Sequence, residues 1–277
     1  MVTVVTDSTC DLYSQVTEQK GIHVVPLRVQ FGAKSFRDGV DLSTAELYEM
    51  LKSERDFPTT SQPTVQDFLD VYNSIEGDIV SIHIATCLSG TYNAALRAKE
   101  LMGDDGERVH VYDSRQLSLG MGLLVLAAKE QADLGMSAPQ ILEHLDNLRS
   151  RLRLWFSLSD LTQLQRGGRI GKATATIGNI LKVKPILTLE STGLAAHDKA
   201  FGNVQVIDKL VRLVEHDHRL HRIKRIFVGH GGCPEFLAPL EEEVRKKIDG
   251  DYELLRGEIG SVVAVHAGAG ALGVMYY

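Results

Sequence analysis

The sequence predicts an α/β protein, with an N-terminal, mostly parallel sheet flanked by helices and a C-terminal α+β domain with a mixed sheet. Up to about residue 152, short apolar runs alternate with amphipathic helical stretches, an order typical of a parallel sheet. Beyond that point hairpin signals occur among the helices, such as the turn residues 191–193. The chain has 277 residues, which is enough for two domains. We therefore expect domains at residues 1–152 and 153–277.

In the N-terminal part, β-branched and apolar runs predict strands, and the segments between them predict helices. The strands are expected at residues 2–6, 22–29, 78–84 and 108–112, with a hairpin or loop at residues 31–41. Two capping boxes, Ser43 with Glu46 and Ser137 with Gln140, indicate helix starts. The apolar spacing in residues 65–72 predicts a further helix.

In the C-terminal part, strands and helices are mixed without strict alternation. Strands are expected at residues 154–158, 186–190, 194–199, 223–228, 252–258 and 262–266, and helices at residues 161–165, 174–181, 204–215 and 235–248. No internal repeat or low-complexity segment divides the chain, so the domain boundary is predicted from this change of pattern alone.

Composition and charge exclude several classes of protein. Apolar residues make up 44% and charged residues 24%, as in a globular protein. The net charge of -6 argues against a nucleic-acid surface. There is no apolar run long enough to span a membrane, and the N-terminus lacks the pattern of a signal peptide. The three cysteines, Cys10, Cys87 and Cys233, form no CxxC pair, which fits a reducing cytoplasm.

Two hydroxyl-rich segments are expected at helix starts. In residues 78–102 an apolar strand leads through a small-residue turn with Ser89, Gly90 and Thr91 into a helical pattern. Residues 59–64 carry further hydroxyls, among them those of Thr60 and Ser61, more than one N-cap needs. A helix N-terminus attracts anions such as carboxylate or phosphate. The alternative is that these hydroxyls only cap the helices.

One further motif resembles a cofactor site and another resembles a metal site, but we expect neither to bind such a group. Residues 268–273 read GAGALG, but a dinucleotide site needs a following helix and an acidic residue about 20 positions on, and the chain ends too soon for either. We expect these glycines to allow close backbone approach. The histidines His216, His218 and His221 lie among arginines that oppose a cation, so a solvated link between helix and strand is the preferred interpretation.

Serine catalysis and anion binding remain as chemical possibilities. No G-x-S-x-G elbow occurs, although Ser89, His266 and Asp7 could assemble in space. Residues 166–169 read RGGR, and two arginines on a glycine loop suit a phosphate or carboxylate. A solvated surface loop is an equally good interpretation of this segment.

Five motifs together resemble the DegV family of bacterial fatty-acid-binding proteins, which are carrier subunits of a fatty acid kinase system. They are VTDST at residues 5–9, TSQP at 60–63, LSGTY at 88–92, RGGRI at 166–170, and His266 with the GAGALG tail. They span almost the whole chain and occur in the family's order. The sequence departs from the family's motif at Ala269-Gly270, where many relatives have proline or another residue beside the glycine.

The resemblance implies a cytoplasmic carrier rather than an enzyme, with no cofactor, no metal and no catalytic residue of its own. It would hold one long-chain fatty acid between its two domains and present the carboxylate to a separate kinase. Thr60 and Ser89 would bind the carboxylate, with His266 nearby and Arg169 at the kinase-facing rim. The expected ligand-binding residues are Thr60, Ser61, Ser89, Gly90, His266 and Arg169.

Two alternatives stay open. One is a serine-dependent lipid hydrolase using Ser89 and His266. The other is a regulatory or scaffold protein with no ligand, in which the hydroxyl-rich segments only cap helices.

Overall fold

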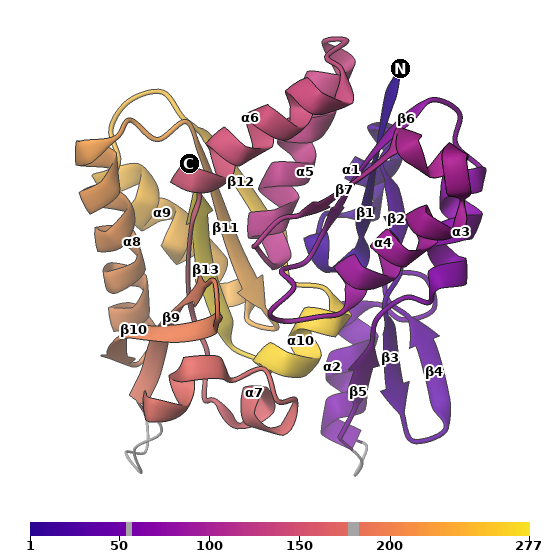
Figure 1. The fold of residues 1–277 in the computed structure, drawn as a ribbon. Coiled ribbons are helices and arrows are strands. Elements are labelled where there is room, and N and C mark those ends of the chain that lie inside the picture. The colour runs from indigo at the N-terminus through magenta and orange to yellow at the C-terminus, as the bar shows by residue number, and fades with distance from the viewer. Residues whose placement is uncertain (54–56, 177–182) are drawn as a thin grey trace. The chain divides into compact units, whose positions relative to one another are not determined.

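The computed structural model describes residues 1–53, 57–176 and 183–277 (Figure 1). The chain forms two compact units. Unit 1 comprises Met1–Arg151 and Gly260–Val262, and unit 2 comprises Leu152–Ile259 and Val263–Tyr277. The segment Gly260–Val262 therefore belongs to unit 1, although its chain neighbours on both sides belong to unit 2. Nothing in the sequence pattern predicts this insertion.

Unit 1 contains a four-stranded sheet in the order β2–β1–β6–β7 (Figure 1). Its strands are β1 (Val2–Asp7), β2 (His23–Val25), β6 (Asp78–His83) and β7 (Val109–Asp113). Every neighbouring pair is parallel, which confirms the predicted N-terminal sheet. The central strands β1 and β6 bury apolar side chains such as Val4 and Ile82 completely, as expected of a parallel sheet covered on both faces.

A smaller antiparallel sheet in unit 1 has the order β4–β3–β5. Its strands are β3 (Arg28–Phe31), β4 (Lys34–Arg37) and β5 (Thr59–Ser61). The predicted single strand at residues 22–29 is wrong, because β2 and β3 belong to different sheets. Pro26 lies between them and has no N–H to donate to a ladder. The Leu27 N–H donates instead to Ser8 Oγ at 3.1 Å, and β3 forms its hairpin with β4.

The prediction that Thr60 and Ser61 lie at a helix start is also wrong, because they belong to β5. Thr60 is paired with Val29 and Ser61 with Arg28 across the antiparallel ladder. The helix that follows, α3 (Val65–Asn73), begins only after Thr64, which caps it in a reciprocal capping box with Asp67. Pairing with β3 determines the conformation of this segment, and its two threonines also favour a strand.

The helices of unit 1 largely follow their sequence signals. Besides α3 they are α1 (Ser14–Gln19), α2 (Thr44–Ser53), α4 (Thr91–Leu101), α5 (Ser118–Asp133) and α6 (Ala138–Arg151), with 3₁₀ turns at Ser8–Cys10 and Gly103–Arg108. The Ser43 N–H donates to Glu46 at 2.8 Å and the Ser137 N–H to Gln140 at 2.9 Å, so both predicted helix starts are confirmed. Helix α5 contacts β1 and β6 and is buried along most of its length.

Unit 2 contains a six-stranded mixed sheet in the order β10–β9–β8–β13–β11–β12. Its strands are β8 (Arg153–Ser157), β9 (Val183–Glu190), β10 (Gly193–Phe201), β11 (Arg225–Gly231), β12 (Glu253–Glu258) and β13 (Ala271–Tyr276). Strands β11 and β12 are parallel, and the other neighbours are antiparallel. The mixed sheet and the hairpin at residues 191–193 are therefore confirmed.

The C-terminal end differs most from the sequence prediction. The expected strand at residues 262–266 is a helix, α10 (Ser261–Ala267), and the tail beyond the glycines forms β13 between β8 and β11. Valine-rich sequence favours a strand locally, but here tertiary packing overrides that preference. Gly273 lies inside β13, where a Cβ would come 3.2 Å from Phe156 Cβ. The segment after Gly270 is therefore a strand, Ala271–Tyr276.

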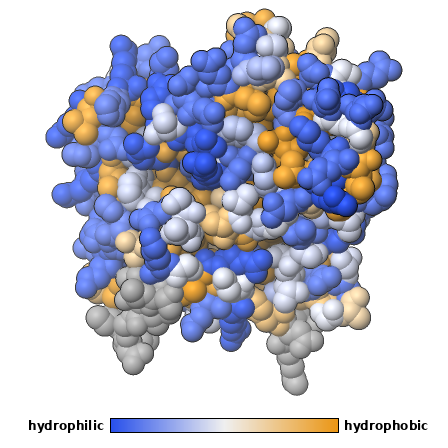
Figure 2. Space-filling model, viewed as in Figure 1, coloured by the Kyte–Doolittle hydropathy of each residue, from blue (hydrophilic) through white to orange (hydrophobic). Residues whose placement is uncertain are grey.

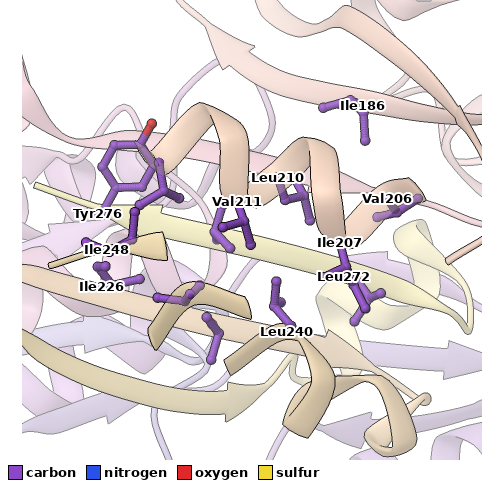
Figure 3. Close-up of a cluster of buried hydrophobic side chains, with 14 of the residues drawn as sticks. Ile186, Val206, Ile207, Leu210, Val211, Ile226, Leu240, Ile248, Leu272 and Tyr276 are labelled. Carbon is purple, nitrogen blue, oxygen red and sulfur yellow. The ribbon is translucent and has the colours of Figure 1, made fainter. Parts of the chain in front are cut away.

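Helices α8 (Asn203–Leu220) and α9 (Leu237–Lys247) cover the core on the sheet that contains β11 and β13 (Figure 3). Leu210 and Val211 of α8 and Leu240 of α9 are fully buried in this core. The other helices in this part of the chain are α7 (Thr162–Arg166) and α10, with 3₁₀ turns at Gly171–Thr176 and Pro234–Phe236. Of the helix predicted at residues 174–181, residues 177–181 lie outside the described part of the chain.

The histidine cluster is not the solvated link that the sequence indicated. Helix α8 continues to Leu220, so His216 and His218 lie on the helix itself, and Arg219 pairs with Glu215 one turn earlier. His218 Nδ1 accepts a hydrogen bond from the Ile223 N–H at 3.3 Å. Among the described residues there is no group of three or more His, Cys, Asp or Glu side chains placed to hold a metal ion.

The face of the molecule visible in Figure 2 is mostly hydrophilic, with smaller hydrophobic areas between. Across residues 1–53, 57–176 and 183–277, the helices are all too short or too polar to cross a membrane.

Candidate functional site

The turn at Ser89 joins β6 to α4 in unit 1. Gly90 is the N-cap residue of α4, and no side chain caps it. The Ser89 Oγ lies 2.9 Å from Thr91 Oγ1 and accepts a hydrogen bond from the Thr91 N–H at 3.3 Å. Thr91 is fully buried, whereas Ser89 is half-buried. Ser89 therefore places a half-buried hydroxyl at the positive end of the α4 helix dipole.

The Thr60 segment lies beside this turn. A Cβ at Gly90 would clash with Oε1 of Gln62, the residue after Ser61. The absence of a side chain at Gly90 thus lets the end of β5 approach the start of α4. A helix and a strand separate the motif TSQ at residues 60–62 from the motif SG at residues 89–90 along the chain. Within unit 1 the two motifs come into contact through Gln62.

Thr60 and Ser61 cannot both face the Ser89 turn. Successive side chains of a strand point to opposite faces, so Thr60 and Ser61 point to opposite faces of β5. Gln62, which contacts Gly90, lies beyond the end of this strand. The sequence prediction assigned the carboxylate to Thr60 and Ser89 and placed both Thr60 and Ser61 at a helix start.

In unit 2 the glycine loop and His266 form a second group. His266 lies near the end of α10, and a Cβ at Gly167 would clash with its Nδ1. Arg169 Nη1 donates to the Gly167 carbonyl at 2.6 Å. Burial, aided by the positive charge of Arg169, lowers the pKa of His266 to about 4. At neutral pH the group therefore holds an uncharged imidazole beside a guanidinium, a combination suited to an anionic ligand.

The glycines of the tail hold this group in place, as the sequence analysis expected. Gly270 has a φ of 90°, and a Cβ there would clash with the Ser159 hydroxyl. That hydroxyl donates to the Ala269 carbonyl at 2.9 Å, and the Gly270 N–H donates to Gly231 at 2.7 Å. The turn after α10 is thus fixed both to the segment before α7 and to the end of β11.

A buried network in unit 1 escaped the sequence analysis. Asp7 accepts hydrogen bonds from the N–H groups of Thr9 and Ile84, both at 3.1 Å, and lies 3.0 Å from His83 Nδ1. His83 Nε2 in turn lies 2.7 Å from Ser81 Oγ. The signal was present, because Ser81 and His83 alternate with apolar residues in β6 and so had to share a buried face.

This network excludes Asp7 from the predicted combination with Ser89 and His266. The Asp7 carboxylate is fully buried, and it already accepts hydrogen bonds from the N–H groups of Thr9 and Ile84. The contacts run from Ser81 to His83 and from His83 to Asp7, as in the catalytic triad of a hydrolase, but all three residues are 0% exposed. A nucleophile must reach its substrate, so the network joins the carboxyl ends of β1 and β6 and does no chemistry there.

The fold is that of a two-unit α/β protein, with one polar group at the Ser89 turn of unit 1 and another at His266 of unit 2. A family model for uncharacterised proteins of the DegV family matches residues 1–277. Protein DegV of Bacillus subtilis is 32% identical over 279 residues, covering 99% of this chain and 98% of that protein. A DegV domain-containing protein of Listeria innocua is 33% identical, covering 99% and 98%. The chain belongs to the DegV family.

Solved structures agree with this assignment. A DegV family protein from Thermus thermophilus, described with fatty acid binding, is 34% identical with a TM-score of 0.91 and covers 100% of this chain and 99% of its own. DegV of Bacillus subtilis, described as a fatty acid binding protein, is 32% identical with a TM-score of 0.89, covering 99% and 98%. A stearic acid-binding protein from Eubacterium ventriosum is 29% identical with a TM-score of 0.92, covering 100% and 98%.

Proposed function

We propose that this protein is a cytoplasmic carrier of long-chain fatty acids. It binds one fatty acid between domains 1–152 and 153–277, and it presents the carboxylate to a separate kinase rather than acting as an enzyme. The observation that carries this proposal is its similarity, along nearly the whole chain, to solved relatives described as fatty acid binding.

The carboxylate head is assigned to the Ser89 turn. A hydroxyl and a helix N-terminus, carrying roughly half a positive charge, can hold a carboxylate without a buried counter-charge. Thr60 is assigned as the second donor, because Gln62, two residues further along the chain, contacts Gly90. The neutral donors bind the anion while leaving its oxygens available for phosphorylation.

His266 and Arg169 are assigned to the same head group in the proposed assembly. With its pKa near 4, the imidazole of His266 is neutral and can donate or accept a hydrogen bond with the acid or with an acyl phosphate. Arg169 supplies the charge that favours the dianionic phosphate after transfer. In this proposal, residues of unit 1 bind the carboxylate and residues of unit 2 bind the phosphate.

The apolar tail of the ligand supplies most of the affinity in this proposal. Each buried CH₂ contributes about 0.8 kcal/mol, so a long alkyl chain outweighs one hydrogen bond of about 1 kcal/mol. Removing one head-group hydroxyl should therefore weaken binding without abolishing it.

The substitution Ser89→Ala tests this assignment. Delipidated protein titrated with palmitate should bind, and Ser89→Ala should weaken binding by about 5-fold to 10-fold, the loss of one hydrogen bond. The matched control is Thr86→Ala in the same loop, whose hydroxyl donates to Asp113 at 2.9 Å and should not affect binding. An unchanged affinity in Ser89→Ala would overturn the assignment, and labelling of Ser89 by a fluorophosphonate probe would favour the hydrolase instead.

A further inference from the structure

The segment Gly260–Val262 is held in unit 1 by a buried acid. Ser261, the first residue of α10, is 1% exposed, and its N–H donates to Asp38 Oδ1 at 3.1 Å. Asp38 follows β4 and is itself only 4% exposed. A carboxylate distant in sequence therefore binds the first turn of the helix that carries His266 at its other end.

A second buried carboxyl group meets the first at Gly260. A Cβ at Gly260 would lie 2.6 Å from Asp11 Oδ1 and 3.7 Å from Asp38 Oδ2, so both side chains converge on this glycine. Asp11 is 6% exposed, and its other oxygen accepts a hydrogen bond from Ser118 Oγ at 2.5 Å. Asp11 Oδ1 leaves no room for a side chain at Gly260, whereas Asp38 Oδ2 lies at an ordinary contact distance.

Three oxygens at this point lack hydrogen-bond partners in the described part of the chain. They are Asp11 Oδ1, Asp38 Oδ2 and Ser261 Oγ. The other titratable groups facing the pair are Asp7 and the Cys10 thiol. No cation is among these groups, and two adjacent buried carboxylates without a counter-charge are strongly disfavoured.

A proton on one of the two carboxyl groups removes the repulsion between them and supplies a donor for an oxygen that has no partner. Burial raises the pKa of Asp38 to about 6, although the hydrogen bond from the Ser261 N–H opposes the shift. Burial also raises the pKa of Asp11 well above its ordinary value, with the charge of Asp38 adding to the effect. A protonated carboxyl group has one donor, which can satisfy an oxygen that otherwise has no partner.

We propose that Asp11 and Asp38 share a proton at neutral pH and act as a proton-dependent clamp on residues Gly260–Val262. Loss of the proton on raising the pH leaves two repelling carboxylates at Gly260 and loosens the first turn of α10. The clamp is a property of unit 1 and does not depend on the fatty-acid proposal.

The direction of the pH effect follows from the raised pKa values. The closed clamp holds a proton that the opened, solvated acids release, so closure is favoured at low pH and weakens as the pH rises. With one proton linked, the opening constant should rise by up to about tenfold for each pH unit above about pH 5.

Native-state hydrogen exchange of the full chain tests the clamp. After correction for intrinsic exchange rates, the protection factors of the Ser261 and Val262 amides should fall with rising pH in the wild type. The double variant Asp11→Asn and Asp38→Asn, which cannot titrate, should abolish that dependence. Asp41→Asn, in the same loop but paired with Arg37 at the surface, is the matched control and should retain it.

Infrared spectroscopy of the wild type keeps the proposal testable if the double variant does not fold. A protonated carboxyl C=O band should be present at pH 7 and should disappear at high pH. Its absence at pH 7, or protection factors at Ser261 and Val262 that do not depend on pH in the wild type, would overturn the clamp.

Discussion

At the scale of single residues, the surroundings of His266 change the pKa of its side chain. A histidine in water titrates near pH 6.5, but this one packs against the backbone of Gly167 with Arg169 beside it. Both burial and the neighbouring charge disfavour its protonated form, which lowers its pKa to about 4. The sequence identified the residue as a candidate but could not predict its charge, because that depends on neighbours nearly 100 positions away.

An NMR titration of His266 tests this environment. We expect its ring signals, assigned by their loss in His266→Gln, to stay constant from pH 8 to about pH 5 and to shift only near pH 4. Arg169→Ala should move the transition upward, while burial keeps it below 6.5. Because the unfolded chain takes up a proton that the folded chain does not, this histidine reduces the free energy of unfolding as the pH falls from about 6.5 to 4. A midpoint near 6.5 in the wild type would contradict the account.

At the scale of elements, the meeting of β5 and α4 depends on one missing side chain. Gly90 has a φ of -79°, which any residue adopts, so its role is to leave room for Gln62. The exposed end of Gln62 can turn away, and a Cβ at Gly90 should therefore displace the β5 end without unfolding the protein.

The substitution Gly90→Ala tests this contact. We expect a loss of stability of about 1 kcal/mol, at the low end for overpacking, and weaker palmitate binding because the contact between Gln62 and the start of α4 is lost. Chemical denaturation and ligand titration measure the two effects. The double variant Gly90→Ala with Gln62→Ala removes the clash and should restore part of the affinity. No rescue, or no effect of Gly90→Ala on binding, would show that the contact does not position the head-group donors.

Elements with strong local signals could be predicted from the sequence. The capping boxes at Ser43 and Ser137 fix helix starts by hydrogen bonds between near neighbours, and the apolar runs of β1 and β6 are long enough to define buried strands. Elements decided by distant partners could not. Residues 262–266 are β-branched yet helical, and Thr60 is in a strand only because β3 pairs with it.

At the scale of the whole molecule, the order of motifs was more informative than any single motif. The Ser89 turn, the RGGR loop and His266 each had an ordinary structural interpretation, and their order along the chain indicated the family that the comparisons confirm. The insertion of Gly260–Val262 into unit 1 and the acid pair that holds it could not be predicted, because Asp11, Asp38 and Gly260 meet only in the folded chain.

The central claim is that this chain carries a long-chain fatty acid, and native mass spectrometry of the protein as purified from bacterial cells tests it most directly. We predict a complex heavier than the apoprotein by the mass of one long-chain fatty acid, released as the free acid on collisional activation. Protein that is ligand-free as purified and that, after incubation with palmitate or oleate, still shows only the apoprotein mass would contradict the account.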